Sequence, residues 1–283
     1  MKNTRKTNTS YTSTRPNIVL IMADDMGYSD IGCYSSEIVT PNLDKLAKEG
    51  VQFTQFYNCA RCCPTRASLL TGLQPHQAGI GHMTFPIGDL PAYQGYLNNQ
   101  CVTIAEVLQS GGYNTYMSGK WHVGGGYDLS NLGKNWDIGG PKHPTPLQRG
   151  FDKFYGTLDG CGSYYYPHTL MKNDSIIHVH QDEDYYYTDV ISDEAVNMID
   201  HAANTEQPFF LYVSYTAPHW PLNAKAEDIA KYNGYYIKGW DQIRTSRHEK
   251  LIEKKLIDPK WEISPRDENS SAWTENSYKE WEA

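Results

Sequence analysis

Three strand-length apolar runs, each followed by polar side chains, constrain the fold of this 283-residue chain more than any other feature. The three runs and the polar residues after them are 17–23 with Asp24 and Asp25, 113–117 with Lys120 and His122, and 209–215 with His219. Segments with helical patterns separate the runs, and strands that alternate with helices predict an α/β fold with a largely parallel central sheet flanked by helices. Ligands of such sheets bind at the carboxyl ends of the strands, so we expect these polar groups to converge there.

The intervening segments give more local expectations. A helix is expected to begin after Thr40, with proline at its first position, and to end at Gly50. Alternation in 51–57 predicts a further strand, and residues 67–71 predict the start of a short helix. Thr103 is expected to cap a helix that runs through residue 109, and another helix is expected to start at 188 or 189 and end at 201.

The last third of the chain is more charged. Residues 225–256 predict a helical region, and Thr274 is expected to cap the start of another helix. The apolar side chains expected on one buried face of the helical region are Trp240, Ile243, Leu251, Ile252 and Leu256.

Composition excludes several classes of partner. A formal net charge of -8 argues against nucleic acid or an anionic membrane surface as the main partner. Every apolar run is far shorter than the roughly 20 residues of a membrane span, and the run 18–23 is shorter than the apolar core of a secretory signal. The protein is therefore expected either to be cytoplasmic or to begin upstream. Residues 1–15 are rich in Thr, Ser, Asn, Lys and Arg, which predicts a disordered tail.

Three of the six cysteines lie within residues 59–63 and need an explanation of their own. Six cysteines are too few for a disulfide scaffold in a chain of this length. Cys59 and Cys62 have the Cys-x-x-Cys spacing of half a zinc site or of a redox pair. Neither Cys101 nor Cys161 belongs to a second ligand pair, so the zinc interpretation lacks half of its ligands.

The segment 62–72, Cys-Cys-Pro-Thr-Arg-Ala-Ser-Leu-Leu-Thr-Gly, closely resembles the signature of the type I sulfatases of the alkaline phosphatase superfamily. Proline two residues and arginine four residues after the nucleophile select Cys62 over its neighbours. Further segments resemble family motifs in the same order, and the resemblance extends from residue 16 to about residue 265, most of all to bacterial arylsulfatases. These further segments are 16–27, 40–44, 119–122 and 217–221.

The resemblance implies a set of site residues. Cys62 would be oxidised to formylglycine by a formylglycine-generating enzyme, and Asp24 and Asp25 would bind a divalent cation together with residue 62. That cation is expected to be calcium, with magnesium as an alternative. Arg66 and Lys120 would hold the hydrated aldehyde.

The same resemblance assigns roles to two histidines. His122 would act as a base, and His219 would bind sulfate or protonate the leaving oxygen, while Lys120 would also contact the substrate. Ser163 lies in a glycine-rich loop, and this position is the only basis for expecting it to contact the substrate.

The implied reaction is hydrolysis of a sulfate ester. One hydroxyl of the hydrated aldehyde would attack sulfur and release the alcohol, and the other would then expel sulfate. The substrate would be a sulfated small molecule or carbohydrate, and the family resemblance implies a periplasmic or extracellular location. A phosphoester or phosphonate hydrolase of the same superfamily is the nearest alternative.

The sequence departs from the family pattern after His219. It contains no Asp-Asn-Gly segment with further metal ligands, no later active-site lysine and no smaller C-terminal domain. We therefore expect residues 16–283 to form an incomplete N-terminal part of a sulfatase catalytic domain. A missing strand would leave an exposed sheet edge, and hydrolysis would be impaired or lost, as in an inactive remnant.

Overall fold

Residues 15–131, 133–180 and 184–279 are described by a computed structural model, in which the chain divides into two compact units. The first, here called the sheet unit, consists of Met1–Asp24 and Cys59–Thr216; the second, the helical unit, consists of Asp25–Asn58 and Ala217–Ala283. Residues 1–14 of the expected tail lie outside the described residues. Arg15 donates a hydrogen bond to the carbonyl oxygen of Gly111, and its guanidinium lies 5.3 Å from the ring centroid of Tyr113.

A six-stranded sheet forms the centre of the sheet unit, in the order β1-β6-β2-β3-β4-β5. The first four strands in this order are parallel, and β4 and β5 are added antiparallel. The strands are β1 (Ile18–Met22), β2 (Asn114–Gly119), β3 (Lys153–Thr157), β4 (Leu170–Lys172), β5 (Ser175–Ile176) and β6 (Phe209–Ser214). The predicted α/β class with a largely parallel sheet is confirmed.

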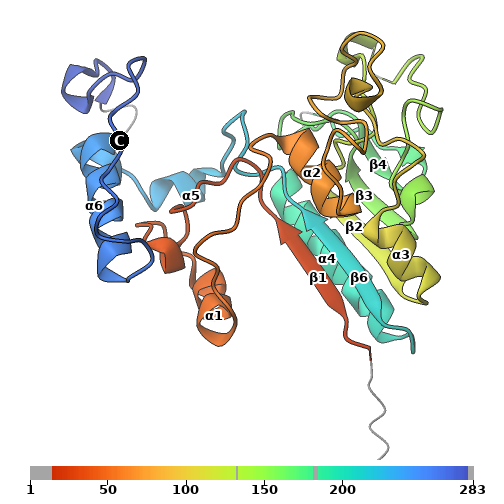
Figure 1. Cartoon of the computed structure of the whole chain (residues 1–283), viewed down its shortest axis with the longest axis horizontal. Coiled ribbons are helices and arrows are strands. Elements are labelled where there is room, and N and C mark those ends of the chain that lie inside the picture. Colours follow the sequence, from red (N-terminus) through yellow and green to blue (C-terminus); the bar gives the residue numbers. More distant parts are fainter. Residues whose placement is uncertain (1–14, 132, 181–183, 280–283) are drawn as a thin grey trace, which may run out of the picture. The chain divides into compact units, whose positions relative to one another are not determined.

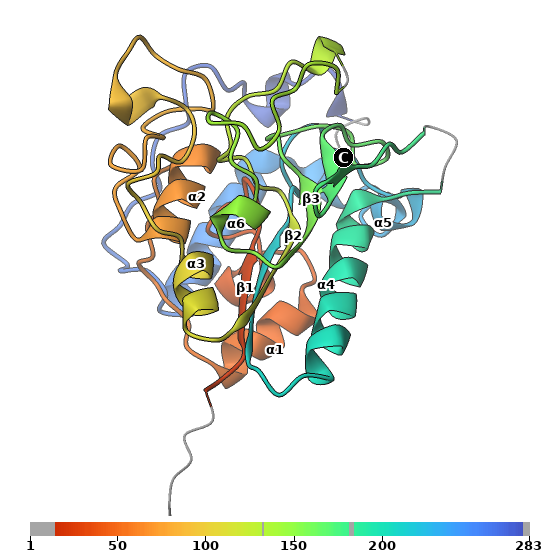
Figure 2. The ribbon, with the colours of Figure 1, turned by 90° about the vertical axis from the view of Figure 1, so that its right-hand side faces the viewer.

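Helices cover both faces of this sheet, as Figure 1 and Figure 2 show. Helix α4 (Tyr187–Ala203) packs on one face against β2 and β6, while α2 (Cys62–Thr71) and α3 (Ile104–Ser110) lie on the other face. Strand β6 is buried along its whole length, which explains why its sequence is continuously apolar up to the final serine. The loops of the sheet unit also contain short 3-10 turns at Pro91–Tyr93, Leu129–Asn131 and Leu147–Arg149.

Strand β1 forms one edge of the sheet. Within the described residues its one strand partner is β6, and Val19 and Ile21 on its outer face are 46% and 57% exposed. Strand β1 is therefore an exposed edge of the sheet within the described residues. Unpaired backbone groups beside apolar side chains are the features that lead sheet edges to pair with other chains.

The end of β2 depends on a glycine. Gly119 has a φ of 116°, and a Cβ added there would lie 2.0 Å from the carbonyl oxygen of Ser214 on β6. The next residue, Lys120, donates its backbone N–H to that same oxygen at 2.7 Å. This close approach of the two strands brings Lys120 to the carboxyl end of the sheet.

The helical unit contains α1 (Pro41–Glu49), α5 (Ala226–Ala230) and α6 (Trp240–Glu253), with 3-10 turns at Gly32–Tyr34, Tyr235–Lys238 and Trp273–Glu275. The predicted helix after Thr40 is confirmed. The region 225–256 is helical in two separate pieces, because Gly234 and Gly239 adopt positive φ between them. Of the apolar face expected there, only Leu251 is buried.

Two local predictions are wrong. Residues 51–57 form no strand, and Val51, Phe53, Phe56 and Tyr57 are exposed. Thr274 lies inside a single 3-10 turn rather than at a helix start. Across the described residues, no helix has both the length and the apolar character needed to cross a membrane.

Candidate active site

Helix α2 presents the predicted nucleophile at its first residue. The helix begins at Cys62, five residues earlier than the predicted start, and Arg61 before it has extended backbone angles. Pro64 falls in the first turn, where a helix does not use the backbone N–H that proline lacks. Gly72 ends the helix in the left-handed conformation and donates to Ser68 at 2.8 Å. Cys62 and Arg66 are therefore one turn apart on the same face.

A buried cluster of charge lies next to Cys62. Arg66 and Lys120 are fully buried, and both approach Asp24 Oδ2: the Arg66 Nη2 lies 3.3 Å away, and the Lys120 Nζ donates a hydrogen bond. Two cations thus share one carboxylate, which leaves one positive charge in excess. Buried charges of this kind require a counter-charge, so the cluster favours an anion beside it.

The guanidinium of Arg66 is only partly engaged. Its Nη1 donates to the Lys120 carbonyl oxygen at 3.1 Å, to the Tyr212 hydroxyl at 3.3 Å and to Ser214 Oγ. Its Nε and Nη2 have no hydrogen-bond partner among the described residues, although both are buried. Burial opposes the charge, but Tyr212 and Asp24 raise the pKa of Arg66. Arg66 therefore keeps its Nε–H donor for an anionic ligand, while its Nη2 is ion-paired with Asp24.

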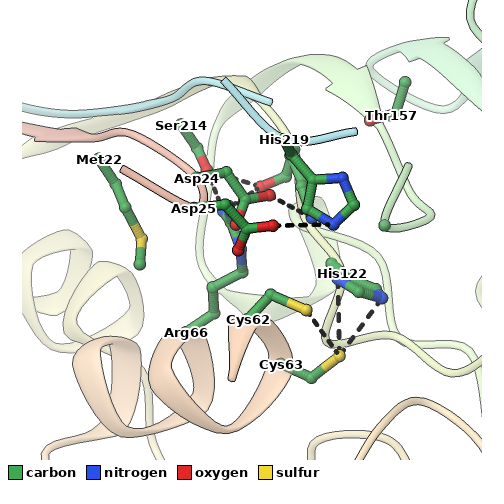
Figure 3. Close-up of polar contacts among 12 residues, drawn as sticks. Met22, Asp24, Asp25, Cys62, Cys63, Arg66, His122, Thr157, Ser214 and His219 are labelled. Atoms are coloured by element: carbon green, nitrogen blue, oxygen red, sulfur yellow. Dashed lines mark hydrogen bonds and ion pairs between the residues drawn. The ribbon is translucent and has the colours of Figure 1, made fainter. Parts of the chain in front are cut away.

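Cys62 lies in a cluster of sulfur and imidazole groups, shown in Figure 3. Its Sγ is 3.9 Å from the Sγ of Cys63, and the Cys63 Sγ is 3.3 Å from Nε2 and 3.5 Å from Nδ1 of His122. The hydrogen bond from Cys63 lowers the pKa of Cys62, with further lowering by His122 and Lys120, while burial opposes it. Cys62 thus carries the more acidic thiol of the pair.

The pKa values of Cys63 and His122 shift in directions that fit Cys62 as the more acidic thiol. The hydrogen bond with Cys62 and burial together raise the pKa of Cys63. Burial lowers the pKa of His122, and Lys120 adds to that lowering. A neutral imidazole can accept a proton, so His122 is suited to act as a base near neutral pH.

His122 is held by an unusual backbone and by a neighbouring glycine. Its φ is 54°, in the left-handed region that non-glycine residues seldom occupy and that clusters at functional sites. A Cβ at Gly160 would lie 2.1 Å from Cε1 and 2.3 Å from Nε2 of the imidazole. Gly160 therefore provides the space that the imidazole of His122 occupies.

Asp25 and His219 meet within the helical unit. The Asp25 carboxylate oxygen Oδ2 lies 3.6 Å from Nε2 of His219, and Nδ1 of His219 is 2.5 Å from the Trp220 carbonyl oxygen. Asp25 has a φ of 60°, so it too is a non-glycine residue in the left-handed region. The carboxylate and the carbonyl oxygen fix the orientation of the His219 imidazole.

Ser163 has a local contact that explains its position. Its hydroxyl accepts hydrogen bonds from the backbone N–H groups of Tyr165 at 3.1 Å and Tyr166 at 3.3 Å. The serine thus closes a turn of its own loop, as serine side chains commonly do. A substrate contact by Ser163 stays a prediction.

Four residues of the site were not predicted from the sequence: Cys63, Gly160, Tyr212 and Ser214. The final serine of an otherwise apolar strand was a signal for Ser214, since a fully buried hydroxyl requires a partner. Cys63 directly follows the predicted nucleophile Cys62, and its contact with His122 depends on packing between distant segments. The Cys-x-x-Cys interpretation selected Cys59 instead, whose Sγ lies 3.5 Å from Ser68 Oγ, outside the cluster with His122.

Oxygen ligands for calcium are only partly present in the described residues. Asp24 and Asp25 are adjacent carboxylates, but Asp24 already pairs with Arg66 and Lys120. Calcium prefers roughly 6–8 oxygen ligands, which is more than these two carboxylates supply. Among the described residues, the group of three ligand side chains that does converge consists of Cys62, Cys63 and His122.

Comparisons with known proteins place this geometry in context. Residues 16–266 match the protein family described as Sulfatase. The chain is similar to an uncharacterized sulfatase of Schizosaccharomyces pombe, with 36% identity over 268 residues that cover 87% of this chain and 45% of the yeast protein. It is also 34% identical over 250 residues to an arylsulfatase of Klebsiella aerogenes, covering 84% of this chain and 50% of that protein.

Solved structures share the fold. The crystal structure of Ps i-CgsB in complex with k-i-k-neocarrahexaose has a TM-score of 0.64 and 33% identity, covering 86% of this chain and 53% of that chain. A protein solved with its substrate D-glucosamine-2-N,6-O-disulfate has a TM-score of 0.58 and 27% identity, covering 78% of this chain and 38% of that chain. The present chain spans about half the length of the curated relatives that it matches.

Proposed function

Because this chain belongs to the sulfatase family, we propose that its site serves the hydrolysis of sulfate esters, with Cys62 as the precursor of formylglycine. The observation that supports this most is the buried pair Arg66 and Lys120, which exceeds its carboxylate partner by one positive charge. A sulfate ester is an anion whose charge is redistributed during reaction, so donors fixed in advance stabilise its transition state. The Nε–H of Arg66, which has no hydrogen-bond partner among the described residues, is suited to that task.

Each residue has a proposed role that follows from its contacts. A formylglycine hydrate at position 62 supplies a hydroxyl nucleophile for attack on sulfur. Arg66 and Lys120 hold the hydrated aldehyde and also contact the sulfate oxygens, and the neutral His122 accepts a proton from the group at position 62. His219, oriented by Asp25, is proposed to protonate the leaving oxygen or to bind sulfate.

Formylglycine is compatible with the position of Cys62. The residue is half-buried at the N-terminus of α2, so a formylglycine-generating enzyme can reach a side chain that still borders the buried cations. For the metal, Asp24 and Asp25 would supply two of the oxygen ligands of calcium, or of magnesium. Because the described residues supply only part of a calcium site, no step of the reaction is assigned to the metal.

A sulfated carbohydrate is the proposed class of substrate. One structural relative was solved with D-glucosamine-2-N,6-O-disulfate as its substrate, and another with a neocarrahexaose. Tyrosines that contact one another near the loop of Ser163 are suited to pack against sugar rings. The rings of Tyr165 and Tyr186 are tilted by 51° to each other, with centroids 5.4 Å apart.

The proposal is tested by producing the chain together with a formylglycine-generating enzyme. Mass spectrometry of the peptide that contains residue 62 measures conversion, and 4-nitrophenyl sulfate and 4-nitrophenyl phosphate serve as paired substrates. We expect conversion at Cys62 and weak sulfate release above background, because the described residues supply only part of a calcium site. The release should be abolished by Cys62→Ala and retained by Cys59→Ala.

Two outcomes contradict the proposal. Faster turnover of the phosphate ester favours the phosphohydrolase alternative. Complete conversion without any sulfate release, in the presence of calcium or magnesium, shows that this chain does not hydrolyse the test ester by itself.

A further inference from the structure

The side chains of Cys62, Cys63 and His122 have the spacing of ligands around one metal ion. Their ligand atoms all lie within 4.8 Å of one another. In a tetrahedral zinc site, Zn–S bonds of about 2.3 Å and Zn–N bonds of about 2.0 Å place two sulfurs roughly 3.8 Å apart and sulfur and nitrogen roughly 3.5 Å apart. The observed separations are 3.9 Å between the two sulfurs and 3.3 Å between the Cys63 sulfur and Nε2 of His122.

We propose that the chain, while Cys62 is still a cysteine, binds Zn²⁺ through Cys62, Cys63 and His122. This site goes beyond the proposed hydrolysis, because it requires the unconverted thiol and uses Cys63, which has no role in the reaction. Two thiolates and an imidazole are soft and borderline ligands that select zinc over calcium or magnesium. Three protein ligands leave a fourth position for water.

The charges around the cluster act in both directions. Arg66, Lys120 and Asp24 together leave one positive charge, which repels a dication, whereas the two thiolates add two negative charges, which attract it. Cys63 and His122 are buried, so the site is largely shielded from water, while the half-buried Cys62 leaves a route by which the ion can enter. Binding exchanges thiol protons for the metal and involves no oxidation or reduction.

Zinc at this site would compete with maturation. The sulfur of Cys62 cannot be oxidised to formylglycine while it is bonded to the ion, so zinc would hold the chain in its precursor form. Formylglycine has no sulfur, so conversion would remove one ligand and weaken the site.

Cobalt substitution tests the site on the reduced, unconverted chain. Titration with Co²⁺ is expected to produce a thiolate-to-cobalt charge-transfer band and the intense visible bands of tetrahedral cobalt, which Zn²⁺ then displaces at one equivalent. Loss of an outer-shell partner costs about 10–100-fold in affinity, so Cys62→Ser, Cys63→Ser and His122→Gln should each weaken binding by at least about 100-fold. The matched control, Cys59→Ser, should bind as the unaltered chain does, and circular dichroism confirms that each variant is folded.

Alkylation provides a second measurement. Zinc is expected to protect the half-buried Cys62 from iodoacetamide but to leave the exposed Cys59 reactive, as measured by peptide mass spectrometry. Binding that survives Cys63→Ser and is lost in Cys59→Ser overturns the proposal in favour of a site at the Cys-x-x-Cys pair. Absence of the charge-transfer band in the folded chain also overturns it. Neither result depends on hydrolytic activity, so the two proposals can fail independently.

Discussion

The guanidinium of Arg66 joins three parts of the sheet unit while it faces the site. Its Nη1 contacts the Lys120 carbonyl oxygen, the Tyr212 hydroxyl and Ser214, and its Nη2 approaches Asp24. A lysine would keep the charge but would not reproduce the planar fork that makes these contacts together. A positive charge at position 66 is therefore not enough by itself to make these contacts.

We predict that Arg66→Lys lowers the free energy of unfolding by about 2–3 kcal/mol, because buried hydrogen-bond acceptors lose their donor. The rise in melting temperature that inorganic sulfate produces in the unaltered chain should disappear in the variant. Differential scanning fluorimetry across a sulfate titration measures both effects. The control is Arg61→Lys, an exposed arginine directly before α2 that contacts His82. Equal sulfate stabilisation in Arg66→Lys and the unaltered chain would show that Arg66 does not bind the anion.

A substitution at Gly160 tests how precisely the imidazole of His122 must be positioned for hydrolysis. An alanine methyl would lie 2.1 Å from the ring, so the ring must move. A displacement of about 1 Å costs roughly 100-fold in rate, so Gly160→Ala should reduce aryl sulfate hydrolysis by about that factor. The NMR shifts of the His122 ring should also change. The control is Gly111→Ala, whose added methyl would lie 3.2 Å from its nearest neighbour outside the adjacent residues. This control is expected to leave the rate of hydrolysis and the NMR shifts of the His122 ring unchanged.

Helix α3 shows how a local sequence signal stabilises an element. Thr103 accepts a hydrogen bond from the backbone N–H of Glu106 at 3.1 Å, and the Glu106 carboxylate accepts one from the backbone N–H of Thr103 at 2.6 Å. The Thr103 hydroxyl also donates to the Arg149 carbonyl oxygen at 2.8 Å, so the cap connects the helix to the loop that precedes β3.

We predict that Thr103→Ala destabilises the sheet unit by about 1–2 kcal/mol, since it removes the cap and leaves a buried carbonyl without its donor. Urea denaturation followed by circular dichroism measures the change. Ser110→Ala at the other end of α3 alters an exposed serine that donates to Val107, and should shift the midpoint much less. Equal shifts for the two variants would contradict a special role for the capping box.

Elements with local signals were predictable, and those that depend on distant partners were not. Thr103 and Glu106 identify the start of α3, because a capping box acts within one turn. Pro41 at the first position identifies the start of α1, where Thr40 makes no side-chain capping hydrogen bond. Residues 51–57 alternate like a strand, but a strand also needs a partner for its backbone hydrogen bonds. Phe53 and its neighbours instead use individual contacts, such as that from the Tyr34 hydroxyl to the Phe53 carbonyl oxygen at 2.5 Å.

The same distinction applies to the candidate site. Cys62, Arg66, Lys120 and Asp24 were predictable because they lie in motifs or at strand ends, and the structure brings all four together. Cys63 meets His122 only through packing of segments 59 residues apart, and no local pattern encodes such a contact.

Considered as a whole molecule, the chain is held together by two separate sets of interactions. The sheet unit has an extensive apolar core, whereas the helical unit has few buried apolar side chains. In the helical unit, Arg247 of α6 instead binds Glu37 through two hydrogen bonds of 2.8 and 2.7 Å, and Asp30 through one of 2.6 Å. This ion-pair network joins the two sequence segments that make up the unit.

We predict that Arg247→Ala destabilises the helical unit by about 2–3 kcal/mol near neutral pH and leaves the sheet unit almost unchanged. Burial would raise the pKa of Glu37, but its hydrogen bonds with Arg247 lower it to about 2. The folded pKa is thus below the unfolded value of about 4.3, so the stabilisation is complete above that value and is lost as the pH falls toward 2. In Arg247→Ala, the stability of the helical unit should therefore fall less as the pH is lowered.

Native-state hydrogen exchange with peptide resolution separates the two units, because each amide reports the opening of its own region. Peptides from α1 and α6 should exchange faster in Arg247→Ala, and peptides from β6 and α4 should not. Arg244→Ala, on the same helix and exposed, removes only contacts with Ser264 and should have a smaller effect. If β6 loses protection in parallel with α6, the two units unfold together and the ion-pair network stabilises the entire chain rather than the helical unit by itself.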